Sequence, residues 1–358
     1  MKVAVLGSGN GGCAAAFDWA FHGHQVSLWS FTDHGHNVEE IAEAGSITCT
    51  GDLEGTAPIA YSGFDLDAAL KGAELVLMVG PAYATEHFGR ELKGRLNPEQ
   101  ALIVMPGSCL GAVVCKNALG LPLTADSPLV GETSTLPYGV RVDAPGHIHM
   151  YNKVDGGMWV AALPGTGTPR LVELLRQVYP GMEPARSILQ TSLQNGNPVI
   201  HPAVTLCNAS RIESTNGGFR FYDDGVTPAS GALIEAVDDE RVAIATKLGI
   251  NLVRDPELGV SQGYMAEATY VEGYVDAPGF AGIPAQKQLD NRYFTEDVGY
   301  GLVFFSELGR QVGVPTPSMD AIIQLVSKIM RRDFRAEGAR TLASVGLDGL
   351  SLEELTAL

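Results

Sequence analysis

The sequence predicts a two-domain α/β protein in which a domain built on a parallel sheet is followed by an all-helical domain. Three observations carry this prediction. An apolar strand runs directly into a glycine-rich turn at the N-terminus, strands and helices alternate through the first half, and strand patterns nearly vanish afterwards. The length of 358 residues also exceeds what one ordinary core accommodates. We expect domains at residues 1–183 and 184–358.

The first element is a short apolar strand at residues 3–6, followed by the turn Gly7-Ser8-Gly9-Asn10-Gly11-Gly12. Three of these glycines match G-x-G-x-x-G, in which they permit a tight turn, the approach of a pyrophosphate and close packing of the next helix. A glycine-rich turn without a ligand is the alternative. The strand before the turn and the alanine-rich helix after it favour a Rossmann-type dinucleotide site. We expect cofactor contacts from Gly7, Gly9, Asn10, Gly11 and Gly12.

The first half continues as a parallel sheet. Strands are expected at 25–30, 74–79, 101–105 and 128–130, with helices at 83–92 and 110–119 between them. In open α/β sheets ligands bind at the carboxyl ends of strands, so Pro81 and Gly107 are expected to line the cofactor site by position. Proline and glycine also simply end strands, which is the plainer explanation.

The pattern changes after residue 136. Short strands with turn signals over 136–163 indicate an antiparallel extension of the sheet, and a helix at 169–179 leads to Pro180-Gly181, the best boundary candidate. Residues 187–335 show helical periodicity, for example at 236–248 and 319–330. The helix at 319–330 is expected to bury one apolar stripe, formed by Ile322, Leu325, Val326 and Ile329.

The composition limits the partners. A net charge of −17, from 24 basic and 41 acidic residues, opposes binding to nucleic acid or an anionic membrane. The longest apolar stretch is too short to span a bilayer, and no signal peptide is seen before the first strand, so we expect a cytoplasmic protein. Five cysteines without C-x-x-C spacing indicate buried free thiols rather than a metal site or disulfides: Cys13, Cys49, Cys109, Cys115 and Cys207.

The loop after the second strand bears on the choice of cofactor. NAD-binding proteins usually carry an acidic residue about twenty residues after the glycines, where it accepts the ribose hydroxyls. This chain has Ser30 there, followed by Thr32, His34 and His36, which can donate hydrogen bonds to a 2′-phosphate. The pattern weakly favours NADPH over NADH. No arginine completes a phosphate clamp, and Asp33 remains available to NAD.

Two polar segments in the second half carry the candidate chemistry. Asn197 and His201 are four residues apart, which on a helix places both on one face. Asn197 could cap this helix with Pro198 in its first turn, whereas Pro202 would kink or start the helix. A histidine beside prolines is more often structural. From this segment alone, a structural role for His201 is favoured over a catalytic one.

The segment Asn291-Arg292-Tyr293-Phe294-Thr295-Glu296-Asp297 supplies complementary charges. Arg292 offers a fork for a carboxylate or phosphate, and Asp297 could orient His201 and stabilise its charged form. A surface ion-pair patch on a helix is an equally good explanation from these residues alone.

Together these motifs resemble the opine dehydrogenases, over nearly the whole chain. The resemblance rests on Gly-x-Gly-Asn-Gly-Gly, Gly131-Glu132-Thr133-Ser134 with Arg141, Asn197-x-x-x-His201-Pro202, Asn291-Arg292-Tyr293-Phe294-x-Glu296-Asp297 and Leu308-Gly309-x-x-x-Gly313-Val314-Pro315-Thr316-Pro317.

The resemblance implies a reductive condensation of an amino acid with a 2-oxo acid, often pyruvate, using NADH or NADPH. It implies that His201 and Asp297 form the catalytic pair, that Asn197 assists, and that Arg292 lies in the interdomain cleft. Arg292 would bind substrate or cofactor phosphate, with Thr133 and Arg141 as weaker substrate-binding candidates. The amino acid, the 2-oxo acid and the oligomeric state, for which a homodimer is one option, are left open.

Two other functions compete with this one. Another two-domain reductase, of the glycerol-3-phosphate or 2-ketopantoate type, would depend on a catalytic lysine, and no lysine lies in a matching motif. A dinucleotide sensor without turnover is the second, and the paired polar motifs argue against it.

Overall fold

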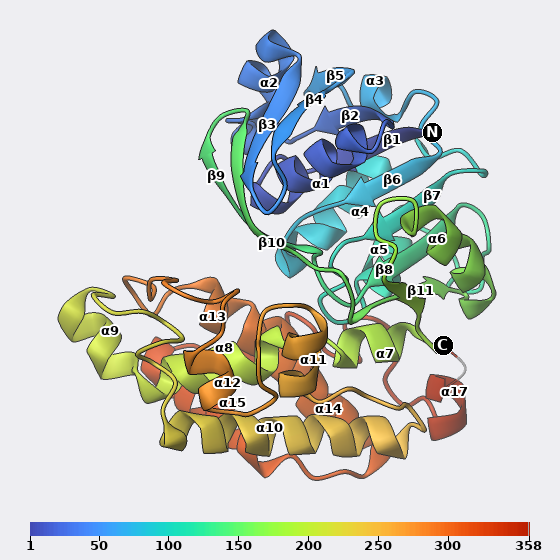
Figure 1. Ribbon diagram of the computed structural model, residues 1–358. Helices are drawn as coiled ribbons and strands as arrows, with labels where there is room; N and C mark the ends of the chain where they lie inside the picture. The colour runs from blue at the N-terminus through green and yellow to red at the C-terminus, as the bar shows by residue number, and fades with distance from the viewer. Residues whose placement is uncertain (357) are drawn as a thin grey trace. The chain divides into compact units, whose positions relative to one another are not determined.

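The computed structural model describes residues 1–356 and 358, and it divides into two compact units, Met1–Thr191 and Ser192–Leu358 (Figure 1). The division falls within helix α7 (Ile188–Leu193). The domain boundary expected after residue 183 lies close to it and stays a prediction.

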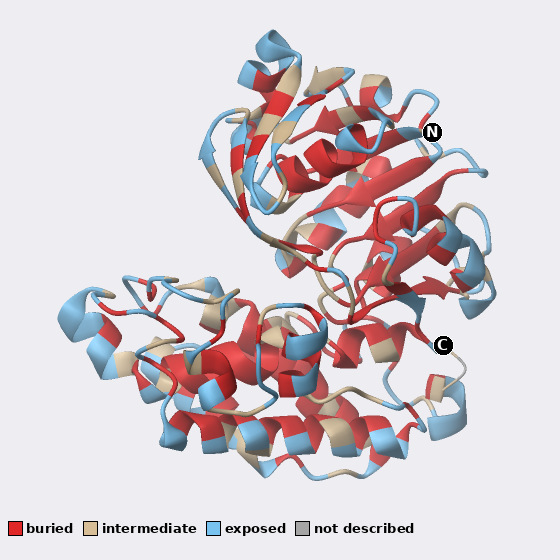
Figure 2. Cartoon of the chain, viewed as in Figure 1, coloured by how far each residue is buried: buried red, intermediate tan, exposed pale blue. Residues whose placement is uncertain are grey.

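The first unit is built on an eight-stranded sheet with the order β12-β11-β8-β7-β6-β1-β2-β5. All neighbours pair in parallel except β8 and β11, which confirms the expected parallel sheet. The central strands are buried along their whole length (Figure 2). The strands are β1 (Lys2–Leu6), β2 (Gln25–Trp29), β5 (Tyr61–Gly63), β6 (Leu75–Met78), β7 (Ala101–Val104), β8 (Leu129–Thr133), β11 (Met158–Leu163) and β12 (Met182–Pro184).

A second, four-stranded sheet corrects the expected antiparallel extension. Of the three strands formed by residues 136–163, β11 joins the main sheet. The hairpin of β9 and β10 instead pairs with β3, in a sheet of the order β4-β3-β10-β9. A strand pattern reveals which residues are buried but not which strand edge is the partner, so the sequence could not separate these two pairings. The strands are β3 (Ser46–Gly51), β4 (Gly55–Pro58), β9 (Tyr138–Ala144) and β10 (His147–Lys153).

Helix α1 (Asn10–Phe21) lies between the two sheets, because it contacts β1 and β2 on one side and all four strands of the second sheet on the other. Its alanines at 14, 15 and 16 are fully buried, and their small size permits this close packing. The other helices of the unit are α2 (Val38–Ala44), α3 (Leu66–Leu70), α4 (Thr85–Leu92), α5 (Gly111–Leu119) and α6 (Thr168–Leu175).

A buried carboxylate ties α1 to the second sheet. The Tyr138 hydroxyl and the Lys153 ammonium each donate to Asp18, both at 2.9 Å. Burial raises the pKa of the Asp18 carboxyl, and Lys153 opposes that shift. The two contacts fix β9 and β10 against the helix that follows the glycine-rich turn.

The second unit is helical in all its named elements within the described residues, as expected. Helix α8 lies at its centre, in contact with α10, α13, α15 and η4. The helices are α8 (Asn197–Cys207), α9 (Ala209–Thr215), α10 (Pro228–Lys247), α11 (Asp255–Ser261), α12 (Glu272–Val275), α13 (Arg292–Thr295), the π-helical η4 (Asp297–Leu302), α14 (Val303–Val312), α15 (Pro317–Met330), α16 (Phe334–Glu337) and α17 (Leu352–Thr356).

The buried stripe of α15 differs from the expected one. Ile322 and Val326 are buried, but Leu325 is 52% exposed and Ile329 is 42% exposed. The buried face instead includes Ile323. Both assignments satisfy helical spacing, because apolar residues lie on more than one side of this helix, and packing against α10 and α14 selects the face.

Four of the five cysteines are buried free thiols, whereas Cys207, at the end of α8, is exposed. Among the described residues, no helix has both the length and the apolar character that a membrane crossing requires.

Two of the three isoleucines of α15, Ile323 and Ile329, provide a matched test of this face. Ile323→Ala should lower the free energy of unfolding by about 2–5 kcal/mol, because it leaves a cavity in a buried site. Ile329→Ala, in the same helix, should change it by less than about 0.5 kcal/mol. Urea unfolding followed by circular dichroism measures both, and equal losses would contradict the assignment.

Candidate active site

The glycine-rich turn has the close approaches that a dinucleotide site requires. Gly7 has φ +110°, and a Cβ there would lie 2.2 Å from the Val79 carbonyl oxygen. A Cβ on Gly12 would lie 1.8 Å from the Gly7 carbonyl oxygen, so only glycine lets α1 start this close to β1. A Cβ on Gly9 would meet nothing within 4 Å. The open backbone at Gly9 and the N-terminus of α1 therefore fit a bound pyrophosphate.

The neighbouring candidates have partners within the protein. The Asn10 side chain accepts a hydrogen bond from the Val142 backbone N–H at 2.8 Å, which ties the turn to β9. Gly11 has little room, because a Cβ would lie 2.8 Å from a Leu136 methyl carbon. Their backbone groups remain the candidate contacts to a cofactor.

The loop after β2 places its two candidates differently. Ser30 is buried, and its hydroxyl donates to the His34 carbonyl oxygen at 3.2 Å. Thr32 begins the short 3₁₀ turn η1 (Thr32–His34) and is exposed, as is Asp33. A cofactor contact from this loop is therefore easier to assign to Thr32 than to Ser30.

Pro81 and Gly107 lie just beyond the carboxyl ends of β6 and β7, as expected. A Cβ on Gly107 would lie 2.5 Å from the Glu132 carboxyl carbon. Glu132, which sequence reasoning did not select as a site residue, is fully buried at the end of β8. It accepts hydrogen bonds from the Ala112 N–H at 2.8 Å and the Thr191 hydroxyl at 2.6 Å.

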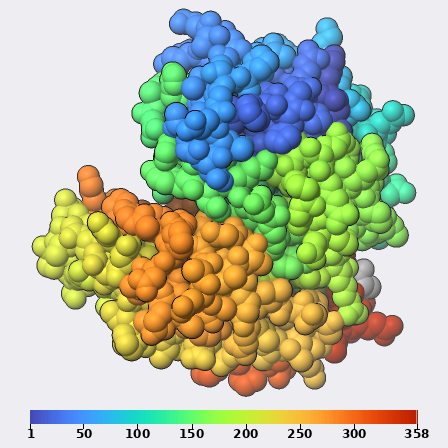
Figure 3. Space-filling model, in the orientation of Figure 1, coloured from blue at the N-terminus to red at the C-terminus, as the bar shows by residue number. Residues whose placement is uncertain are grey.

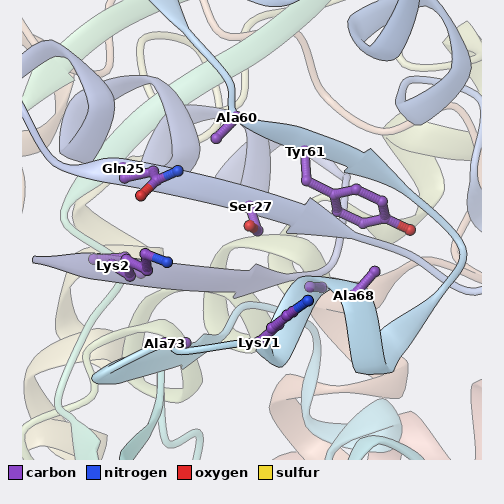
Figure 4. Close-up of a pocket in the computed structure, with 10 residues that line it drawn as sticks. Lys2, Gln25, Ser27, Ala60, Tyr61, Ala68, Lys71 and Ala73 are labelled. Carbon is purple, nitrogen blue, oxygen red and sulfur yellow. The ribbon is translucent and has the colours of Figure 1, made fainter.

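A cavity of about 200 Å³ lies at the amino ends of β1 and β2, whereas the glycine-rich turn follows the carboxyl end of β1 (Figure 4). Lys2 and Gln25 line it, and they are the first residues of β1 and β2. Because the glycine-rich turn follows the carboxyl end of β1, this cavity is separate from the candidate dinucleotide site.

Helix α8 carries His201 in its second turn. Its N-cap is Gly196, so Asn197 is its first residue, which corrects the expectation that Asn197 caps it. Pro202 lies inside the helix and neither starts nor ends it. Pro202 removes one hydrogen bond of the helix, the one that its N–H would have donated to the Pro198 carbonyl. Asn197 and His201 therefore share one helix face.

The structure brings His201 and Asp297 together. His201 Nδ1 lies 2.8 Å from Asp297 Oδ2, and both side chains are buried, at 9% and 4% exposed. Asp297 is the first residue of η4, and π-helical turns of this kind are frequent at functional sites. A carboxylate can only accept, so it holds the proton of His201 on Nδ1 and leaves Nε2 as the nitrogen for proton exchange.

Aromatic residues that the sequence did not single out surround this imidazole. The Tyr222 hydroxyl lies 3.0 Å from His201 Nε2, and the Tyr293 ring stacks on the imidazole with centroids 3.9 Å apart at 22°. Phe221 contacts the ring edge-on. The sequence offers only the run Phe219-Arg220-Phe221-Tyr222 as a signal, and no fixed spacing links it to His201.

Arg292 lies at the start of α13, whose N-cap Asn291 accepts from the Tyr293 N–H at 3.2 Å. The Arg292 side chain is 56% exposed, and its Nε lies 3.3 Å from Glu296 Oε2, one turn along the chain. An exposed guanidinium can bind a further anion, because one carboxylate does not occupy all of its donors.

The remaining two candidates lie in the first unit. The Thr133 hydroxyl is buried and donates to the Thr135 carbonyl at 2.9 Å. Arg141 is exposed on β9, and its guanidinium donates to the Val140 carbonyl at 2.9 Å. Substrate binding by either residue stays a prediction.

Two known sequence families match parts of this chain. Residues 184–330 match the family described as NAD/NADP octopine/nopaline dehydrogenase, alpha-helical domain. Residues 2–107 match the NAD-dependent glycerol-3-phosphate dehydrogenase N-terminus, which confirms the dinucleotide-binding fold of the first unit.

Solved structures share the whole fold. An octopine dehydrogenase in complex with NADH and agmatine superposes with a TM-score of 0.79 at 18% identity, covering 100% of this chain and 98% of that one. A yersinopine dehydrogenase with NADP⁺ gives a TM-score of 0.71 at 14% identity, covering 99% of this chain and 96% of that one.

Closer relatives exist in sequence. An opine dehydrogenase of Arthrobacter sp. (strain 1C) is 37% identical over 352 residues, covering 97% of this chain and 96% of the relative. A vitopine synthase of Allorhizobium ampelinum is 31% identical, with the same coverage of both chains. With this identity over nearly its full length, the chain belongs to the opine dehydrogenases, a family of NAD(P)-dependent oxidoreductases.

Proposed function

We propose that this chain joins the amino group of an amino acid to a 2-oxo acid, with pyruvate as the first candidate, and reduces the product with NADH or NADPH. The buried His201–Asp297 pair carries the proposal, because it provides a proton-exchanging group in a chain that also has a dinucleotide turn. Membership of the opine dehydrogenases supports the reaction class.

The reaction has two parts, and protons move in both. The amine nitrogen attacks the keto carbon, and loss of one water gives a C=N bond. When bound, the reduced nicotinamide supplies the hydride that reduces this bond, and one proton completes the secondary amine. His201 accepts and donates protons at Nε2, while Asp297 holds Nδ1 and stabilises the imidazolium. Asn197 assists from the same face of α8.

Substrates and product all carry carboxylates, which an overall acidic protein repels unless positive charge is placed locally. Arg292 is the leading candidate to bind a substrate carboxylate, because it lies five residues before Asp297 and its side chain is exposed. Thr133 and Arg141 are secondary candidates. Arg292 could equally bind a cofactor phosphate.

For the cofactor we propose NADPH as the preferred form. The exposed Thr32 and the neighbouring histidines can donate to a 2′-phosphate, and no acidic residue stands at the end of β2. Asp33 is the residue through which NADH would compete.

Turnover with a substrate panel tests the reaction. Oxidation of NADH or NADPH should occur only when a 2-oxo acid such as pyruvate and an amino acid are both present, and mass spectrometry should find the secondary amine. His201→Gln serves as the inactive control. Reduction of a 2-oxo acid without any amine would indicate a simple keto-acid reductase, and cofactor binding without turnover across the panel would indicate a sensor.

The pairing of Asp297 with His201 can be tested separately. Asp297→Asn keeps the shape but removes the charge that favours imidazolium, so kcat should fall by about 10²-fold or more and the pH–activity profile should move to lower pH. NAD(P)H affinity, measured by fluorescence, should stay unchanged. Asp290→Asn, at the exposed aspartate just before the segment Asn291–Asp297, is the control. An unshifted profile would show that the two residues are not coupled.

The cofactor preference has its own pair of variants. Thr32→Asp places a carboxylate where it would repel a 2′-phosphate, so kcat/KM for NADPH relative to NADH should fall about tenfold or more. Asp33→Asn should leave NADPH use intact or improved. A parent enzyme that prefers NADH, and loses that preference in Asp33→Asn, would contradict the proposal.

A further inference from the structure

We propose that Tyr222 is a positioning residue of the reaction, whose hydroxyl occupies His201 Nε2 and holds that nitrogen in place for proton exchange. The inference rests on the proposed function, because it assigns a role to the partner of the proposed proton-exchanging atom. It adds a third group to the pair of His201 and Asp297.

Each nitrogen of the His201 imidazole lies within hydrogen-bond distance of a side chain. Asp297 lies 2.8 Å from Nδ1 and the Tyr222 hydroxyl lies 3.0 Å from Nε2, while Tyr293 covers one ring face. Tyr222 is 4% exposed. Two hydrogen bonds at opposite nitrogens and a stacked ring fix both the orientation of the imidazole and its rotation, so Nε2 has one position.

A tyrosine hydroxyl suits both protonation states of His201. With neutral His201, whose proton is on Nδ1, the Tyr222 O–H donates to Nε2. With imidazolium, Nε2–H donates to the Tyr222 oxygen, and the hydroxyl proton turns away from Nε2 by rotation about one bond. Burial, reinforced by Tyr293 and Asp255, raises the pKa of Tyr222 well above its ordinary value, so the hydroxyl stays protonated.

An aromatic stack fixes Tyr222 itself. Its ring lies 4.3 Å from that of Phe280 at 13°, and Phe280 stacks in turn on Tyr264 at 4.9 Å and 11°. Tyr222 also stacks on Tyr274, at 6.5 Å and 17°. Phe280 and Tyr264 belong to the segment between α11 and α13, which forms the surface of the second unit in orange in Figure 3. Removing the hydroxyl alone should therefore leave the ring in place.

Several charged and titratable groups around the pair bear on a pH measurement. Burial, and then Asp238, raise the pKa of Asp255 to about 7. A change in the pH profile must therefore be measured as a difference between matched variants. The groups near Tyr222 or His201 are Asp297, Tyr293, Asp255, Tyr264, Tyr274 and Arg292.

Tyr222→Phe is the direct test. Loss of a hydrogen bond to a charged group should lower kcat by about 10- to 100-fold with little change in KM. The pH–activity profile should move to lower pH, because the hydrogen bond to imidazolium is charge-assisted and stronger than that to the neutral ring. Tyr264→Phe removes a hydroxyl from the same stack but not from His201, and should change kcat and the profile far less than Tyr222→Phe does. The melting temperature of both variants should stay close to that of the parent.

A Tyr222→Phe enzyme with parental kcat and an unshifted profile would overturn the proposal. So would equal losses in Tyr222→Phe and Tyr264→Phe, because they would indicate a role in packing alone.

Nitrogen-15 spectra of the histidines test the same contact without turnover. The His201 resonances, assigned by their loss in His201→Gln, should show a proton on Nδ1 and a hydrogen-bonded Nε2 above the pH at which His201 titrates. A free Nε2 overturns the proposal even if Tyr222→Phe fails to fold. If the parent enzyme has no activity with the substrate panel, the proposed function fails, whereas the spectra still decide whether Tyr222 holds Nε2.

Discussion

The hydrogen bond between His201 and Asp297 is the contact on which the second unit depends for chemistry. Both side chains are almost fully buried, and a buried carboxylate without a partner would be destabilising by several kcal/mol. The hydrogen bond therefore requires α8, which carries His201, and η4, which carries Asp297, to pack in one fixed position relative to each other. The central place of α8, which contacts α10, α13, α15 and η4, fixes the positions of the two elements. Large apolar residues on α14 and α15 then stabilise the arrangement that the polar pair needs.

The first unit meets a different constraint, which is the close approach of backbone to backbone. Gly12 lets α1 start against the end of β1, and Gly7 lets the turn approach the Val79 carbonyl, at distances that any side chain would prevent. Gly9 leaves open space beside the helix N-terminus. This arrangement provides an anion site from backbone groups alone. In a chain with a net charge of −17, such a site can bind a pyrophosphate without a cluster of basic side chains.

The surroundings of His201 divide its hydrogen bonds between two kinds of partner. Asp297 is charged and acts on Nδ1, whereas the buried Tyr222 is neutral and acts on Nε2. A charged partner at both nitrogens would hold the imidazolium too firmly to release a proton. One charged and one neutral partner leave His201 able to change its protonation state while its ring stays fixed.

The sequence by itself determined the features that local patterns encode: the glycine-rich turn after β1, the parallel strands and the helical second half. The pairing of the motifs that contain His201 and Asp297 came from the resemblance to the opine dehydrogenases, because the residues alone also fitted a surface ion-pair patch. The sequence did not determine the separate four-stranded sheet, the buried face of α15 or the position of Tyr222 at Nε2. Each of these depends on a partner far away in the chain, and residue spacing along one segment carries no information about which distant surface that segment will contact. Tertiary packing alone decided them, because the free energy of burial depends on the surfaces that meet and not on the order of residues within either one.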